Sequence, residues 1–370
     1  MVNEERLVKR FMEYVRIDSE SKNEKAFGEH LAAELRALGM EVHLGPVLTE
    51  EGSNFGNIVA KLPGNVPGTP VAFSCHMDTV TPGIGIKPVV RDGMIYSDGT
   101  TILGADDKAG IAEVMEALTE LTEEEIQHGP VEVVFSVMEE KGLRGATNLD
   151  SADLEARHVY VLDGGTVGGL TMESPYQEKL DITVFGKAAH AGVEPEKGIS
   201  ALYVAAKAIA RMKLFRIDEE TTANIGTIEG GRATNIVMPE VKMQAEARSL
   251  NPQKIERQMR HMIELFEEEA AEAGAKLELV RRPSYPGYKL DPKDEIVVKA
   301  QRAYEKAGIP VIFEKSGGGS DTNVFWLKGI KALTLGTGEE KAHTLEESVN
   351  IAEMVKSVRA IRGIVQEYIH

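Results

Sequence analysis

The runs VAFSCHMD at residues 71–78 and VEVVFSVMEE at residues 131–140 decide the fold of this chain. Each is a short apolar segment that ends in acidic residues or histidine, and VYVLD at residues 159–163 repeats the pattern. Apolar runs of this kind, separated by the helical pattern of residues 105–121, predict buried parallel strands in an α/β sheet covered by helices. Since ligands bind beyond the carboxyl ends of such strands, we expect these polar residues to share one site.

The composition of the 370 residues favours a soluble, globular protein with two domains. No apolar run reaches the roughly 18 residues that cross a bilayer. A formal net charge of −17 argues against nucleic acid or an anionic membrane as a partner. The charged amino-terminal segment lacks the apolar core of a signal peptide, which indicates a cytoplasmic protein. The single cysteine, Cys75, excludes an intramolecular disulfide and is expected to be buried and inert.

A change of pattern divides the chain into a larger domain of residues 1–175 and 284–370 and an inserted domain of residues 176–283. The inserted part predicts strand, helix, strand, strand, helix and strand in that order, which is the ferredoxin-like β-α-β-β-α-β arrangement. After it the α/β pattern resumes. The last predicted helix starts at residue 351, with Asn350 and Glu353 at capping-box spacing.

Acidic residues and histidines gather at the predicted strand ends, with no lysine or arginine in the same apolar runs. They are His76, Asp78, Asp106, Asp107, Glu139, Glu140, Asp163 and, far downstream, His343. A metal ion is the least costly way to balance converging carboxylates. Two divalent cations carry +4 against −3 from three ligand carboxylates, so two metals bridged by an acid fit best. Histidine and carboxylate ligands suit zinc, with cobalt or manganese as replacements.

Each part of this set has a simpler interpretation when it stands alone. His76 would be a satisfied histidine at a strand end, and Asp106 and Asp107 would cap a helix. Glu139 and Glu140 would form a solvated acidic turn, or would divide the work as metal ligand and general base. The segment GADDKAG at residues 104–110 has acids where a phosphate loop needs backbone amides, which argues against nucleotide binding.

Seven segments, followed by one histidine, together resemble the dinuclear-zinc exopeptidase family. They are HMDTV (76–80), DGTTILGADDKAG (98–110), VFSVMEEKGLRGA (134–146), LDGG (162–165), KAAHAGVEPEKGISA (187–201), GGRATNIV (230–237), SGGGSDTNVF (316–325) and the histidine of KAHTLEE (341–347). The family includes peptidase T, glutamate carboxypeptidase and the acyl-amino-acid deacylases, and the resemblance is strongest to the peptidase T-like branch. It implies a mixed, mostly parallel sheet covered by helices, with an inserted α+β domain for lid and dimer formation.

The resemblance implies a role for each member of the polar set. The implied metal ligands are Asp106 as the bridge, His76 and Asp163 on one zinc, and Glu140 and His343 on the other. Glu139 is implied to be the general base that activates a metal-bound water, and Asp78 to be the partner that orients His76. The peptide bond between Asp106 and Asp107 is often cis in relatives.

The resemblance also implies substrate contacts and a homodimer. In relatives a histidine at the place of His190 reaches the other subunit's site as an oxyanion donor, and residues at the places of Asn235 and Gly318 contact the substrate. The simpler interpretations are a loop residue for His190 and a plain turn for the glycines. Lys315 stands where peptidase T has an arginine beside the glycine-rich loop. Arg232 is a second candidate for the substrate carboxylate.

The predicted activity is hydrolysis of an amide bond near the end of a small peptide, by a tripeptidase or an aminopeptidase-like exopeptidase. The same zinc site with a different pocket would remove the acyl group from N-acyl amino acids. A peptide-binding or metal-binding protein without catalysis is the remaining class. Glu139 separates that class from the enzymes, and here every catalytic position is filled.

Overall fold

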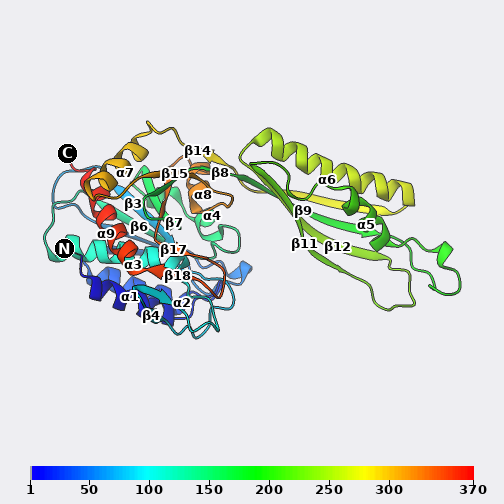
Figure 1. Cartoon of the computed structure of the whole chain (residues 1–370), viewed down its shortest axis with the longest axis horizontal. Helices are drawn as coiled ribbons and strands as arrows, with labels where there is room; N and C mark the ends of the chain where they lie inside the picture. Colours follow the sequence, from blue (N-terminus) through cyan, green and yellow to red (C-terminus); the bar gives the residue numbers. More distant parts are fainter. Residues whose placement is uncertain (1) are drawn as a thin grey trace. The chain divides into compact units, whose positions relative to one another are not determined.

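The computed structural model describes residues 2–370, which form two compact units (Figure 1). Unit 1 holds the residues up to Met172 together with Lys289–Lys315 and Ser320–His370. Unit 2 holds Glu173–Tyr288 and Ser316–Gly319, and the predicted inserted domain, residues 176–283, lies within it. Among residues 2–370, no helix combines the length and the apolar character needed to cross a membrane.

A mixed sheet forms the centre of unit 1. Its strands in spatial order are β1 (Glu41–Leu44), β2 (Ile58–Leu62), β6 (Val131–Ser136), β3 (Val71–His76), β7 (His158–Gly164), β16 (Lys331–Gly336), β8 (Gly169–Ser174) and β14 (Tyr288–Lys289), with β15 (Ile312–Lys315) beside β8. The central strands β6, β3, β7 and β16 are parallel. Antiparallel strands β2 and β8 flank them. The predicted sheet with a parallel centre is confirmed.

Helices cover both faces of this sheet. They are α1 (Glu4–Arg16), α2 (Lys25–Ala37), α3 (Ala105–Glu123), α4 (Arg144–Asn148), α7 (Glu295–Lys306), α8 (Asp321–Leu327) and α9 (Ile351–Gln366). Successive strand residues point to opposite faces, so Phe73 and Tyr160 stack at 5.9 Å between ring centroids on the side of α7. On the other side Ala72 and Val159 pack with Phe325 of α8.

Short elements of unit 1 differ from the sequence prediction. Strand β3 ends at His76, two residues before the end of the run quoted at residues 71–78, because the chain beyond it pairs through Thr79 with the segment around Glu20. A small antiparallel sheet was not predicted, since strands of two or three residues show no periodicity. It consists of β17 (Glu339–Glu340), β18 (Ser348–Asn350), β5 (Met94–Tyr96) and β4 (Val89–Arg91). Among residues 2–370, 3₁₀ turns occur at Thr49–Glu51 and Ser151–Asp153 in unit 1 and at Pro195–Lys197 in unit 2.

Unit 2 is an antiparallel sheet with two helices on one face. Its elements are β9 (Tyr176–Phe185), α5 (Ala201–Arg211), β10 (Phe215–Arg216), β11 (Thr221–Gly230), β12 (Glu240–Ser249), α6 (Pro252–Ala273) and β13 (Lys276–Tyr285). The spatial order is β10-β11-β12-β9-β13. Alternate residues of β9, such as Leu180 and Ile182, are buried with Met259 and Phe266 of α6. The predicted β-α-β-β-α-β order is present, with β10 as an added edge strand.

Candidate active site

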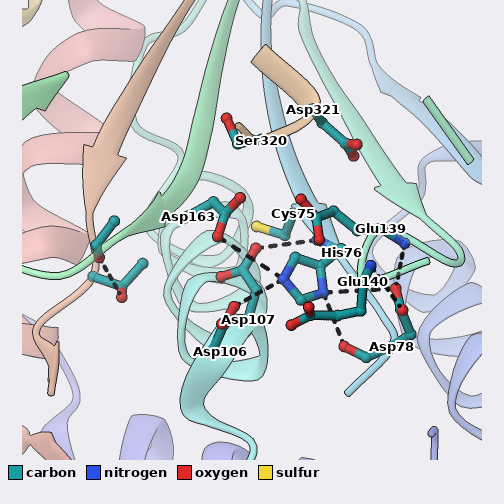
Figure 2. A network of polar contacts seen from close by, with 12 residues as sticks. Cys75, His76, Asp78, Asp106, Asp107, Glu139, Glu140, Asp163, Ser320 and Asp321 are labelled. Carbon is teal, nitrogen blue, oxygen red and sulfur yellow. Dashed lines mark hydrogen bonds and ion pairs between the residues drawn. The ribbon is translucent and has the colours of Figure 1, made fainter. Parts of the chain in front are cut away.

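Strand ends and loops of unit 1 bring the predicted polar set together, and Figure 2 shows its members apart from His343. His76 is the last residue of β3, and Glu139 and Glu140 follow β6. Asp163 lies near the end of β7, Asp106 and Asp107 at the start of α3, and His343 in the loop between β17 and β18. Asp78 follows the end of β3 by two residues. The parallel centre of the sheet explains the convergence, because parallel strands end at one edge.

The carboxylate of Asp106 lies between two histidines. Its Oδ1 is 2.8 Å from Nε2 of His76, and its Oδ2 is 3.0 Å from Nε2 of His343. A further acid stands beside each histidine: Asp163 Oδ1 is 3.9 Å from the His76 nitrogen, and Glu140 Oε1 is 2.6 Å from the His343 nitrogen. The five side chains therefore make two histidine-carboxylate groups that share Asp106.

This donor set fits divalent cations. Ligand atoms of His76, Asp106 and Glu140 all lie within 4.8 Å of one another. The Nδ1 of His76 donates a hydrogen bond to the backbone oxygen of Asp78 at 2.8 Å, which leaves Nε2 as the nitrogen with a free lone pair. Hydrogen bonds with Asp106 and Glu140 raise the pKa of His343 to about 10. An imidazole held so strongly in its charged form indicates a place built for positive charge.

Asp106 and its neighbour Asp107 point in different directions. The peptide bond between them is cis, as the family resemblance implied, and neither residue has helical backbone angles. Oδ2 of Asp107 accepts the backbone N–H of His76 at 3.1 Å, and Asp107 is fully buried. Only Asp106 faces both histidines, and Asp107 instead holds the end of β3.

The Asp78 carboxylate does not make the contact expected of it. Its Oδ1 is 3.7 Å from Nδ1 of His76, beyond hydrogen-bonding distance. It accepts the backbone N–H groups of Glu139 at 2.8 Å and Glu140 at 3.2 Å, and the hydroxyl of Ser21 at 2.7 Å. Because β3 ends at His76, the alternation that would place residues 76 and 78 on one face is lost. Asp78 thus orients His76 through its backbone oxygen and holds the Glu139 loop through its carboxylate.

Glu139 has the environment of a proton acceptor. The residue is 9% exposed, and burial followed by the charge of Asp163 raises the pKa of its carboxyl well above the usual range. Burial and Asp106 raise the pKa of Asp163 in the same way. Carboxyls whose pKa is shifted upward are suited to exchange protons near neutral pH.

Sequence reasoning missed three further buried acids. Oδ2 of Asp321 accepts the hydroxyl of Ser136 at 2.5 Å, and burial raises the pKa of Asp321 to about 6. Burial and the charge of Asp106 raise the pKa of Glu339 well above its usual range. Glu347 is 1% exposed. Asp321 and Glu347 lie in segments that carry the family resemblance, SGGGSDTNVF and KAHTLEE, but neither follows an apolar run of the kind that marked the other acids.

The predicted substrate contacts lie in unit 2, apart from Lys315, which is exposed at the end of β15 in unit 1. His190, Arg232 and Asn235 are exposed. The backbone N–H of Ala191 donates to the backbone oxygen of Asn235 at 3.0 Å, so the loops that carry His190 and Asn235 adjoin.

An arginine that was not predicted lies beside Gly318. A Cβ at Gly318 would be 3.8 Å from Nη1 of Arg248. The Nε of Arg248 donates to Glu246 at 2.9 Å. Arg248 belongs to β12, whose sequence EVKMQAEARS carries no motif that would have marked it.

Fold and site together define a protein with an α/β unit that carries a candidate metal centre and a second, ferredoxin-like unit. Residues 72–367 match peptidase family M20/M25/M40, and the chain belongs to this family. It is a metallopeptidase of the exopeptidase type, which confirms the predicted family and enzyme class.

Three relatives cover almost the whole chain. The uncharacterized protein YqjE of Bacillus subtilis (strain 168) is 47% identical over 368 residues, which are 99% of each chain. The structure of aminopeptidase PepT from Bacillus cereus ATCC 10987 has a TM-score of 0.89 and 46% identity over 99% of each chain. A tripeptidase structure from Staphylococcus aureus subsp. aureus Mu50 has a TM-score of 0.94 and 42% identity, covering 99% of this chain and 98% of that one. The peptidase T-like branch is confirmed.

Proposed function

We propose that the chain removes the amino-terminal residue of small peptides, tripeptides among them, at a centre of two zinc ions that cobalt or manganese can replace. The observation that carries this proposal is the Asp106 carboxylate, which lies 2.8 Å from His76 and 3.0 Å from His343. A shared acid with a histidine on each side has the form of a bridged two-metal site. Similarity to an aminopeptidase and a tripeptidase supports the substrate class.

The proposed ligands are the five residues of the shared-carboxylate arrangement: Asp106 as the bridge, His76 and Asp163 for one ion, and Glu140 and His343 for the other. Two bound cations would polarise the substrate carbonyl and make water a better nucleophile at neutral pH. Glu139 takes the proton of the attacking water and returns it to the leaving amine. Asp78 keeps Glu139 in position through the hydrogen bond to its backbone N–H at 2.8 Å.

Unit 2 is proposed to bind substrate and a second subunit. It contributes none of the five ligands, and His190 and Asn235 lie exposed on adjoining loops, which supports a role outside the metal centre. We assign His190 to the oxyanion in the partner subunit's site of a cytoplasmic homodimer. Arg248 beside Gly318 joins Arg232 and Lys315 as a candidate for the substrate carboxylate. A planar guanidinium binds carboxylates with two hydrogen bonds, which favours the two arginines over Lys315.

A substrate panel tests the proposal. The enzyme is loaded with zinc or cobalt and assayed on tripeptides with free, acetylated or amidated ends, on dipeptides and on N-acyl amino acids. We expect the first residue to be released from free tripeptides and acetylation of the amino terminus to abolish cleavage. Hydrolysis of N-acyl amino acids with intact tripeptides would contradict the proposal and make the chain a deacylase.

A further inference from the structure

The carboxylate of Glu347 binds three backbone amides of one short segment. Its Oε2 accepts the N–H groups of Leu103 at 2.7 Å and Gly104 at 2.8 Å, and its Oε1 accepts the N–H of Asp106 at 3.0 Å. The side chain is 1% exposed. A buried carboxylate is costly unless hydrogen bonds replace its water. These three charge-assisted bonds offset part of that cost, although burial still raises the pKa of Glu347 above its usual value.

The segment that Glu347 holds has no local substitute for these bonds. Gly104, the residue before α3, adopts a left-handed conformation with φ of 72° and has no side chain to cap the helix. The first amides of a helix lack partners within the helix. Glu347 supplies the missing hydrogen-bond acceptors from a loop more than two hundred positions away in the sequence. The position of Asp106 therefore depends on that loop.

The same loop carries a second candidate metal ligand. His343 precedes Glu347 by four residues, and its Nε2 lies 3.0 Å from Oδ2 of Asp106. Glu347 therefore connects the backbone of the shared acid to the loop of the histidine that faces it. The adjacent Glu346 makes no such connection, because its side chain is 74% exposed and pairs with Lys341 at 2.5 Å.

We propose that Glu347 is a positioning residue of the metal centre, whose carboxylate fixes the backbone of Asp106 relative to the His343 loop and so sets the spacing of these two ligands. The inference rests on the proposed two-metal function. Glutamine at this position keeps the shape, but it loses the charge and turns an NH₂ group toward a backbone donor. Residues that orient a metal ligand typically change metal affinity or activity by about 10–100-fold when replaced.

The test compares Co²⁺ binding by the full chain and its Glu347→Gln, Glu347→Asp and Glu346→Gln variants. Affinity is measured in metal-buffered titrations followed by the visible absorption of bound cobalt, and the fold of each metal-free protein by circular dichroism. For Glu347→Gln we expect a native fold, about 10–100-fold weaker binding and a shifted cobalt spectrum. Glu346→Gln should match the wild type in all three.

The possible outcomes test the role of Glu347 separately from the proposed two-metal function. Wild-type cobalt affinity and spectrum in Glu347→Gln would overturn the role of Glu347 and leave the metal centre standing. Equal weakening by Glu346→Gln would also overturn it, because the effect would then be a general one of loop charge. If Glu347→Gln does not fold, Glu347→Asp decides by the same two readouts. A wild-type protein that binds no cobalt would refute the proposed function and the inference together.

Discussion

Replacing Glu139 with glutamine removes a proton acceptor and leaves the candidate ligands in place. The residue is 9% exposed, and its backbone N–H is held by Asp78 at 2.8 Å, so an isosteric amide should keep the same position. The amide cannot take the proton of the attacking water. General acid-base catalysis contributes ~10²–10⁴-fold, which at about 1.4 kcal/mol per tenfold corresponds to about 3–5 kcal/mol of transition-state stabilisation.

The assay measures kcat, KM and metal content of Glu139→Gln with a tripeptide substrate. We expect kcat to fall by about two to four orders of magnitude, with KM and metal content close to wild type. Glu140→Gln is the matched control, because Glu140 Oε1 contacts His343 at 2.6 Å and its replacement should release metal. A Glu139→Gln enzyme with wild-type kcat would refute the assignment, and one that loses metal would make Glu139 a ligand.

Three further predictions concern metal, pH and assembly. Chelation should lower the melting temperature, because an ion bound only to the native state stabilises it by mass action; superimposed melts with and without chelator would contradict a metal centre. In the metal-free protein the folded pKa of His343 is about 10, above its ordinary 6.5, so the stability it contributes is full below pH 6.5 and is lost as the pH rises through 10. The gap in melting temperature between wild type and His343→Ala should therefore shrink from pH 6.5 to pH 10, and a gap that widens would show the opposite linkage. Mixing inactive Glu139→Gln and His190→Ala subunits should restore part of the activity, since each hybrid dimer assembles one complete site; verified hybrids without activity would confine His190 to its own chain.

The long apolar runs predicted the fold because burial on both faces leaves a clear pattern. The runs before His76, Glu139 and Asp163 became the parallel strands β3, β6 and β7, and the acids at their ends converge. The predicted order of strands and helices in the inserted part is present in unit 2, where alternate residues of β9 are buried. The end of β3 could not be predicted from the sequence, because it depends on a tertiary contact, the pairing of Thr79 with the segment around Glu20.

The partners of the site residues were harder to predict than the residues themselves. The carboxylates of Asp78 and Glu347 accept hydrogen bonds from backbone amides. Such contacts show no characteristic residue spacing in the sequence, because the donors can come from any segment. Arg248 is similar, since its neighbour Gly318 lies in a distant loop. Residue type and strand position indicate which groups can bind a metal, and only the folded chain shows what holds them in place.

A crystal structure of the zinc-loaded protein, with anomalous data collected at the zinc edge, tests the central claim most directly. The account predicts two zinc peaks per chain, about 3.5–4 Å apart and bridged by Asp106. His76 and Asp163 should bind one ion, and Glu140 and His343 the other. A single peak, or two peaks without Asp106 between them, would contradict it.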